Sequence, residues 1–112
     1  MGAHAFPPEF KNDHQGYIQL ICEEMIPAVA EENLAEFCDV FCENGYFTLD
    51  DSRKILETAK ECGLIPRLHA DEFVDSGAAD LAAEVGAISA DHLMAVSDDG
   101  IQKMAENGVI AT

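Results

Sequence analysis

Two short segments of this chain combine imidazoles with carboxylates at positions suited to catalysis. His69 is followed closely by Asp71 and Glu72, and His92 comes about one helix and one strand later. Each histidine lies where a short apolar run ends. In an α/β protein the carboxyl ends of parallel strands meet along one edge of the sheet, so these residues are expected to share a pocket. Imidazoles and carboxylates gathered in this way can bind a metal ion, activate water and transfer protons.

The four polar residues suit different chemical tasks. His69 is the main candidate for a metal ligand, because a neutral imidazole readily binds zinc or iron; a histidine without a ligand role is the alternative. Glu72, in the loop after the strand, could donate or accept a proton in the same pocket. Asp71 is expected to point away from Glu72 and to be structural. His92 is expected at the equivalent position on the next strand.

Other candidates are weaker. His4 has the same relation to the first apolar segment, whereas His14 stands in a polar loop and is expected at the surface. Cys38 and Cys42 are spaced to lie on one face of a strand. We interpret both thiols as core residues, because a zinc site there would need further ligands nearby. The sequence contains neither a glycine-rich phosphate loop nor a G-x-S-x-G motif.

A repeating order of helix, glycine and strand would position these residues. Three helices are expected, each starting at a capping hydroxyl and ending at a glycine: 48–63, 76–86 and 97–108. The buried stripe of the second helix should contain Ala78, Leu81, Ala82 and Val85, and that of the third should contain Ile101, Met104 and Ala105. Short apolar runs are expected to be strands: 37–42, 64–69, 87–92 and 109–112.

The first third of the chain is less regular. Residues 17–33 have helical spacing, but Pro27 cannot complete a continuous helix, so we expect two segments that meet near Met25. Residues 2–5 are expected to be the tail of an earlier strand, ended by Pro7 and Pro8.

Strands joined by single helices must be parallel, which predicts an α/β fold. About five strands are expected, either in a small doubly wound sheet or in a partial (β/α)₈ TIM-type barrel. A complete barrel needs about 250 residues. The 112 residues, with about five strands, would therefore hold little more than half of one. The end at Thr112, where a strand begins, suggests a chain cut from something longer.

Composition narrows the possible functions. The balance of 6 basic against 22 acidic side chains, a net charge of −16, argues against binding to nucleic acid or anionic membranes. An apolar fraction of 48% is typical of one folded domain. No apolar run approaches the ~18 residues of a membrane span, and residues 1–8 lack the features of a signal peptide. With scattered cysteines interpreted as reduced thiols, this predicts a cytoplasmic protein.

Several segments in the same order resemble one family. They are residues 2–10, 22–29, 37–43, 69–72 and 89–93. They resemble imidazolonepropionase, the cyclic-amide hydrolase of histidine degradation in the amidohydrolase superfamily. The resemblance implies metal-dependent hydrolysis of 4-imidazolone-5-propanoate to N-formimidoyl-L-glutamate. It also implies a small-molecule substrate and a homo-oligomeric, dimeric full-length enzyme.

The resemblance assigns a role to each candidate residue. His69 matches the metal ligand after the fifth barrel strand, for zinc or iron. Glu72 matches an acid/base that also contacts the substrate ring. His92 matches the histidine that polarises the carbonyl or assists proton transfer, and His4 matches a substrate-binding histidine.

The chain also departs from the family pattern. The His-x-His pair of the first strand does not occur in it, and the metal-binding aspartate of the last strand would lie beyond Thr112. The resemblance therefore implies that residues 1–112 are the central portion of the barrel, without its first and last strands. The metal would need ligands outside this chain, and the isolated fragment is expected to be inactive. Two alternatives remain: a non-catalytic α/β binding module, or another amidohydrolase acting on a different cyclic amide. Unpaired sheet edges predict self-association.

Overall fold

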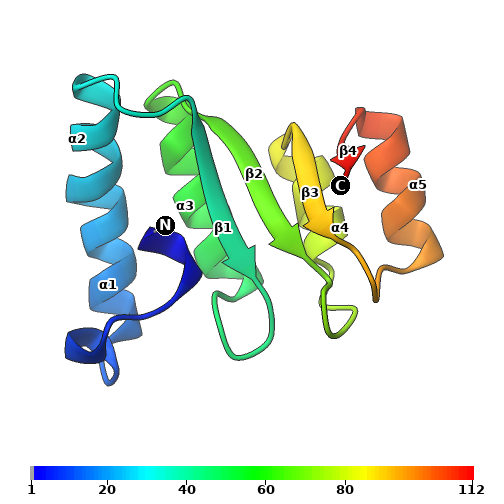
Figure 1. Cartoon of the computed structure of the whole chain (residues 1–112), viewed down its shortest axis with the longest axis horizontal. Coiled ribbons are helices and arrows are strands. Elements are labelled where there is room, and N and C mark those ends of the chain that lie inside the picture. The colour runs from blue at the N-terminus through cyan, green and yellow to red at the C-terminus, as the bar shows by residue number, and fades with distance from the viewer. Residues whose placement is uncertain (1) are drawn as a thin grey trace.

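The chain forms an open parallel sheet of four strands. The computed structural model describes residues 2–112, and its strands lie side by side in sequence order (Figure 1). Their bounds are β1 Phe37–Cys42, β2 Ile65–Ala70, β3 Ser89–His92 and β4 Ile110–Ala111. The predicted α/β class, with parallel strands alternating with helices, is confirmed.

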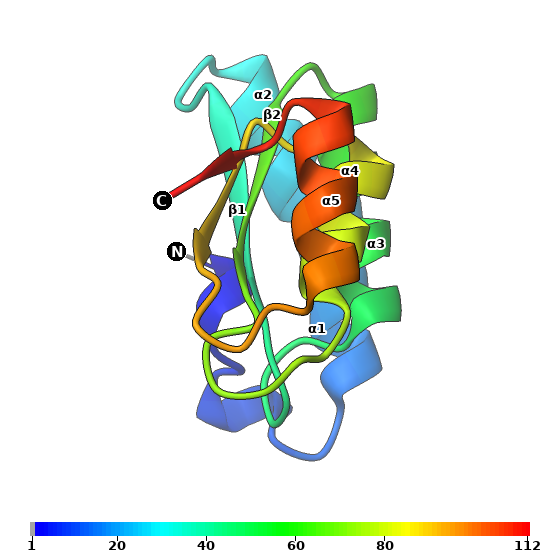
Figure 2. The ribbon, with the colours of Figure 1, turned by 90° about the vertical axis from the view of Figure 1, so that its right-hand side faces the viewer.

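Three helices cover one face of this sheet. They are α3 (Leu49–Glu61), α4 (Ala78–Val85) and α5 (Asp98–Asn107), and the N-terminus lies on the other side of the sheet (Figure 2). A doubly wound sheet carries helices on both faces. An open sheet in sequence order with connecting helices on one face is instead consistent with an arc of a (β/α)₈ barrel.

The core lies between the strands and these helices. Alternate strand residues point into it, so Val40, Leu68 and Ala90 are fully buried. The predicted stripe of α4 is confirmed, since all four of its residues are buried. Of the stripe predicted on α5 only Met104 is buried, and the expected burial of Ile101 and Ala105 is wrong. Among the described residues, α5 packs mainly against α4, so the rest of its surface has no neighbour to cover it.

Local capping signals account for most helix ends. Thr48 caps α3 as predicted: its hydroxyl accepts a hydrogen bond from the Asp51 amide while the Asp51 carboxylate accepts one from the Thr48 amide, which completes a capping box. Ser97 caps α5 as predicted, through the amide of Gly100. The expected cap by Ser76 is wrong. Gly77 holds the N-cap position of α4, with φ at +81°, and the Ser76 hydroxyl donates to the Asp71 carboxylate instead.

The first helical region runs through Pro27 without leaving helical geometry. The α1 helix (His14–Leu20) and the α2 helix (Ile26–Glu31) are joined by a π-helical turn, Ile21–Met25. The change from π- to α-helical turns falls at Met25 and Ile26, near the predicted junction, but the expected break is wrong, because the backbone stays helical across it. Pro27 lies at the start of α2, directly after the π-helical turn in which the Ile26 amide donates to the Ile21 carbonyl, five residues back.

The N-terminal residues differ from expectation. Gly2–His4 forms a short 3₁₀ turn beside β1 and no strand. The Tyr17 hydroxyl donates to the carbonyl of Gly2, and His4 is held by a side chain of β1, so this segment is anchored through contacts other than a β-ladder. In the described part of the chain, no helix is both long and apolar enough to cross a bilayer.

Candidate metal and catalytic site

A row of polar side chains lies on the sheet face opposite the helices. Along β1 and β2, the residues that alternate with the buried ones point to this open face, and they include Asp39 and His69. The parallel register pairs Phe41 with His69, so Asp39 lies on the neighbouring strand, one side-chain step before His69. The strands therefore bring a carboxylate next to the candidate metal ligand.

Asp39 connects two imidazoles. Its Oδ2 lies 3.0 Å from Nε2 of His4, and its Oδ1 lies 3.2 Å from Nδ1 of His69. The two imidazole rings meet edge to face, with centroids 4.8 Å apart. All three side chains are partly buried, with between 20% and 31% of their surface exposed. The N-terminal turn is thus attached to the sheet by the residue that also contacts His69.

The row continues to the other two candidates. The ring centroids of His69 and His92 are 5.0 Å apart, and Nε2 of His92 lies 3.6 Å from a carboxylate oxygen of Glu72. The structure therefore brings together all four residues that the sequence singled out: His4, His69, Glu72 and His92. Their chemical roles stay predictions.

The position of His92 has a conformational cause. The register pairs His69 with Asp91, so His92 comes one residue later than an equivalent strand position. Regular alternation would send its side chain to the helix face. His92 and Leu93 instead have φ values of +77° and +57°. The strand ends in this left-handed conformation, and the ring of His92 lies beside that of His69.

Asp71 has the structural role expected of it. Its carboxylate is only 1% exposed and accepts hydrogen bonds from the amides of Ser76, Ala78 and Ala79 and from the Ser76 hydroxyl. These bonds fold the loop after β2 and hold the start of α4. Glu72 follows Asp71 directly, so the buried aspartate also fixes the backbone that carries the Glu72 side chain, the candidate acid/base.

The residue that the sequence did not single out is Asp39. The alternation of 37–42 predicts that Asp39 lies on the same face as Phe37 and Phe41. Every candidate histidine is far from Asp39 in the sequence, so its contacts could not be inferred from local spacing. Pairing the strands in parallel would have placed it next to His69. The contact between Asp39 and His69 therefore follows from the register of the two strands, and a single sequence does not show that register.

His69 fits a metal ligand in its chemistry. An ionised carboxylate only accepts hydrogen bonds, so the nitrogen facing Asp39, Nδ1, must carry the proton. The opposite nitrogen, Nε2, then keeps its lone pair for a metal ion. Histidine ligands of metals usually donate their other N–H to a carboxylate in this way. Each of His4, Asp39 and His69 also offers a ligand atom within 4.8 Å of the others.

The other histidine and the thiols take no part. His14 stacks on Phe6, with ring centroids 3.8 Å apart. Burial, as the main cause, raises the pKa of the Cys38 and Cys42 thiols to about 11. Both thiols alternate with Asp39 along β1, so they point to the helix face and away from the polar row. Their interpretation as core residues agrees with this, and among residues 2–112 all four cysteines are free.

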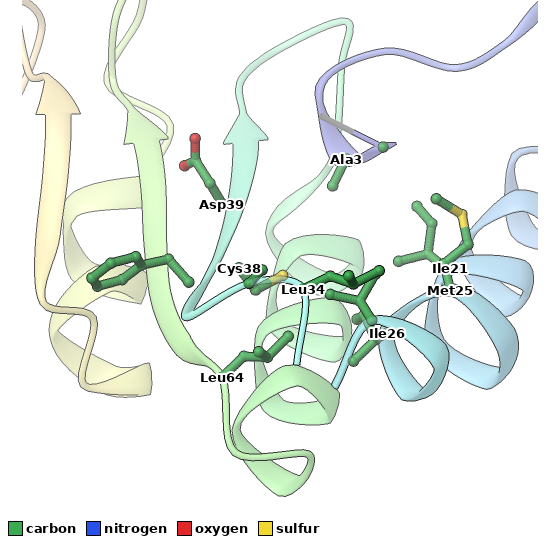
Figure 3. A pocket seen from close by; sticks show the side chains of 12 residues that line it. Ala3, Ile21, Met25, Ile26, Leu34, Cys38, Asp39 and Leu64 are labelled. Atoms are coloured by element: carbon green, nitrogen blue, oxygen red, sulfur yellow. The ribbon is translucent and has the colours of Figure 1, made fainter. Parts of the chain in front are cut away.

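A separate hollow of about 270 Å³ lies between β1 and the α1–α2 region. Its lining is mostly apolar, and Figure 3 shows Ile21, Ile26, Leu34 and Leu64 around it. The polar row touches it only through Asp39. The hollow therefore supplies none of the acid/base or metal-binding groups.

Comparisons with known proteins agree with the sequence resemblance. No protein-family model matches the chain. It is 64% identical over 99% of its length to the imidazolonepropionase of Shouchella clausii, 62% over 98% to that of Geobacillus thermodenitrificans, and 59% over 100% to that of Clostridium tetani. It spans only about a quarter of their length, between 25% and 27%. The predicted resemblance is confirmed over the whole chain.

Proposed function

We propose that this chain forms part of the active site of an imidazolonepropionase. Such an enzyme hydrolyses the cyclic amide of 4-imidazolone-5-propanoate to N-formimidoyl-L-glutamate. High identity along the whole chain supports the proposal. The observation that carries it is the meeting of His69, His92 and Glu72 at the carboxyl end of neighbouring parallel strands, where barrel enzymes hold their catalytic groups.

In this proposal His69 contributes one metal ligand through Nε2, and further ligands come from outside the chain. A zinc or iron ion bound there would polarise the substrate carbonyl and activate water. The orientation of His69 supports this role, because Nδ1 faces Asp39 and Nε2 does not. One imidazole holds a metal weakly, and catalytic zinc sites generally use three protein ligands.

Glu72 would transfer the protons of the reaction, and His92 would assist by hydrogen bonding. Hydrolysis breaks the bond between the carbonyl carbon and a ring nitrogen, so the attacking water loses a proton and the departing nitrogen gains one. Glu72 can accept the first proton and return it to nitrogen, while His92 donates a hydrogen bond to the carbonyl oxygen. Their separation of 3.6 Å lets one substrate ring contact both groups. His4, at the other end of the row, would contact the substrate.

We also infer the setting of the enzyme. Its substrate is a small molecule, and the free thiols of the described residues suit the reducing cytoplasm. Unpaired sheet edges and an open polar face suit a larger assembly, which would be a complete barrel and then a dimer of barrels. A net charge of −16 disfavours nucleic acid or anionic membranes as partners.

A hybrid enzyme tests the function directly. This chain would replace the matching segment of the Shouchella clausii enzyme, and hydrolysis of imidazolone propanoate would be measured with zinc or iron. We expect activity close to that of the parent enzyme. His69→Ala in the hybrid should abolish activity and lower bound metal, whereas His14→Ala, which alters a histidine outside the row, should change neither.

The hybrid also separates the alternatives. A folded, metal-containing hybrid without any hydrolase activity would contradict the proposal and favour a binding module. Hydrolysis of a different cyclic amide, with none of imidazolone propanoate, would instead favour another amidohydrolase.

A further inference from the structure

We propose that Asp39 is a positioning residue of the metal site, which holds His69 in the tautomer that leaves Nε2 free to bind a metal ion. The inference rests on the proposed function only for the role of His69 as a ligand. Asp39 lies in the middle of β1 on the open face, and it contacts His69 and His4 through different oxygens. Nothing in the resemblance assigns it a role.

The hydrogen-bonding capacity of the carboxylate decides the tautomers. Each oxygen of an ionised aspartate can accept but cannot donate. Both imidazole nitrogens that face Asp39 must therefore carry protons: Nδ1 of His69 at 3.2 Å and Nε2 of His4 at 3.0 Å. The lone pair of a neutral His69 is then on Nε2, and that of a neutral His4 is on Nδ1. An imidazole without this contact would exchange between the Nδ1–H and Nε2–H tautomers.

The neighbours of His69 add to this orientation. Its ring packs edge to face against His4 and against Phe41, with centroids 4.8 and 6.0 Å away. The carboxylate hydrogen bond also makes the opposite nitrogen more basic, which strengthens its bond to a metal. Asp39 would thus raise the affinity of the site for metal without binding the ion itself.

A direct role of Asp39 as a ligand predicts a different result. His4, Asp39 and His69 are close enough to hold an ion among themselves. Removal of a direct ligand would leave a site that cannot be filled even at high metal concentration. Removal of a positioning residue would weaken binding and leave the stoichiometry unchanged.

The first test reads the tautomers without metal. The 112-residue chain would be labelled with ¹⁵N in histidine, and the ring nitrogens would be observed by NMR above pH 8. We expect His69 as the Nδ1–H tautomer and His4 as the Nε2–H tautomer. Asp39→Asn should disturb at least one of them, because its amide presents a donor to one imidazole. Asp39→Glu, which keeps an acceptor-only carboxylate, should preserve both.

Asp91→Asn is the matched control for this change. Asp91 also lies on the open face, in register with His69, but its carboxylate accepts hydrogen bonds from Arg67 and Thr112. The same substitution there should leave the histidine tautomers and the zinc affinity as in the parent. A purely structural effect of losing a carboxylate from this face would affect both variants.

The second test measures zinc affinity in the hybrid enzyme by competition with a chelator. Asp39→Asn should weaken zinc binding by about 10- to 100-fold, the range typical for partners of metal-bound histidines. One zinc should still bind at saturation. Unchanged affinity together with unchanged tautomers would overturn the proposal. Complete loss of zinc at saturation would overturn it as well, in favour of direct ligation.

These readouts separate the inference from the proposed function. A hybrid that binds zinc but hydrolyses no imidazolone propanoate would contradict the function, and the zinc affinities would still decide the role of Asp39. If Asp39→Asn fails to fold, judged by circular dichroism, Asp39→Glu decides. The proposal then requires parent-like tautomers and a zinc affinity within about 10-fold of the parent.

Discussion

Asp71→Ala should strongly destabilise the fold, because this buried carboxylate organises the loop that carries Glu72. Its oxygens accept from the amides of Ser76, Ala78 and Ala79 at 2.8, 3.1 and 2.9 Å. The bonds to Ala78 and Ala79 are buried, so water cannot replace the lost acceptor. Each buried donor left without a partner costs about 1–3 kcal/mol.

The expected loss in the free energy of unfolding is about 3–5 kcal/mol, since two fully buried amides and one half-buried amide lose a charged acceptor. This is a large part of the ~5–15 kcal/mol that stabilises a typical domain. Urea unfolding of the 112-residue chain, followed by circular dichroism, measures it. Asp71→Asn keeps the shape of the side chain, but its NH₂ group is a donor that faces backbone amides which are donors as well. The free energy of unfolding is therefore expected to fall by about 1–3 kcal/mol.

Asp75→Ala supplies the control in the same loop. The Asp75 side chain is exposed and accepts only one long hydrogen bond, 3.4 Å from the amide of Gly77. Its replacement should change the free energy of unfolding by no more than about 0.5 kcal/mol. If Asp71→Ala behaved like this control, the buried carboxylate would not hold the loop, and the fixed position of Glu72 would need another explanation.

Three further outcomes follow from the site and its surroundings. The isolated 112-residue chain, supplied with zinc or iron, should show no turnover of imidazolone propanoate, and robust turnover would refute the need for outside ligands. In the hybrid enzyme, Glu72→Gln should lower kcat by about 10²- to 10⁴-fold, the usual contribution of acid–base catalysis, with bound zinc unchanged; loss of zinc would assign Glu72 to the metal instead. Because burial raises the pKa of the Cys38 and Cys42 thiols to about 11 from 9.0, their alkylation by iodoacetamide, followed by mass spectrometry, should be slow at pH 8 and should accelerate up to about pH 11. Rapid alkylation of the folded chain at pH 8 would contradict their burial.

Local rules explain which parts of the fold could be predicted. A cap at Thr48 or Ser97 depends on a few neighbouring residues, so the sequence alone suffices. Ser76 does not cap the helix, because its hydroxyl and its amide both donate hydrogen bonds to the carboxylate of Asp71 at the preceding strand end. Ile101 failed as a core residue because burial depends on a neighbouring element, and none of the described residues covers that side of α5.

The site shows the same division between local pattern and spatial arrangement. The spacing of His69 and His92 predicted two imidazoles at one edge, but strict strand alternation would have separated them, since Asp91 holds the position in register with His69. The left-handed backbone at His92 and Leu93 instead turns the imidazole of His92 towards that of His69. Histidine tolerates that conformation, whereas a bulky leucine rarely adopts it, and such residues cost about 1–3 kcal/mol.

Two hydrogen bonds hold this strained strand end in place. The amide of His92 donates to the carbonyl of Thr112, and the amide of Leu93 donates to that of Ala70, both at 3.0 Å. The backbone is thus anchored to the neighbouring strand and to the end of the chain just where it departs from regular geometry. Strain retained at such a point is better explained by the direction it gives the His92 side chain than by any gain in stability, because a regular strand end would have turned that imidazole away from His69 and Glu72.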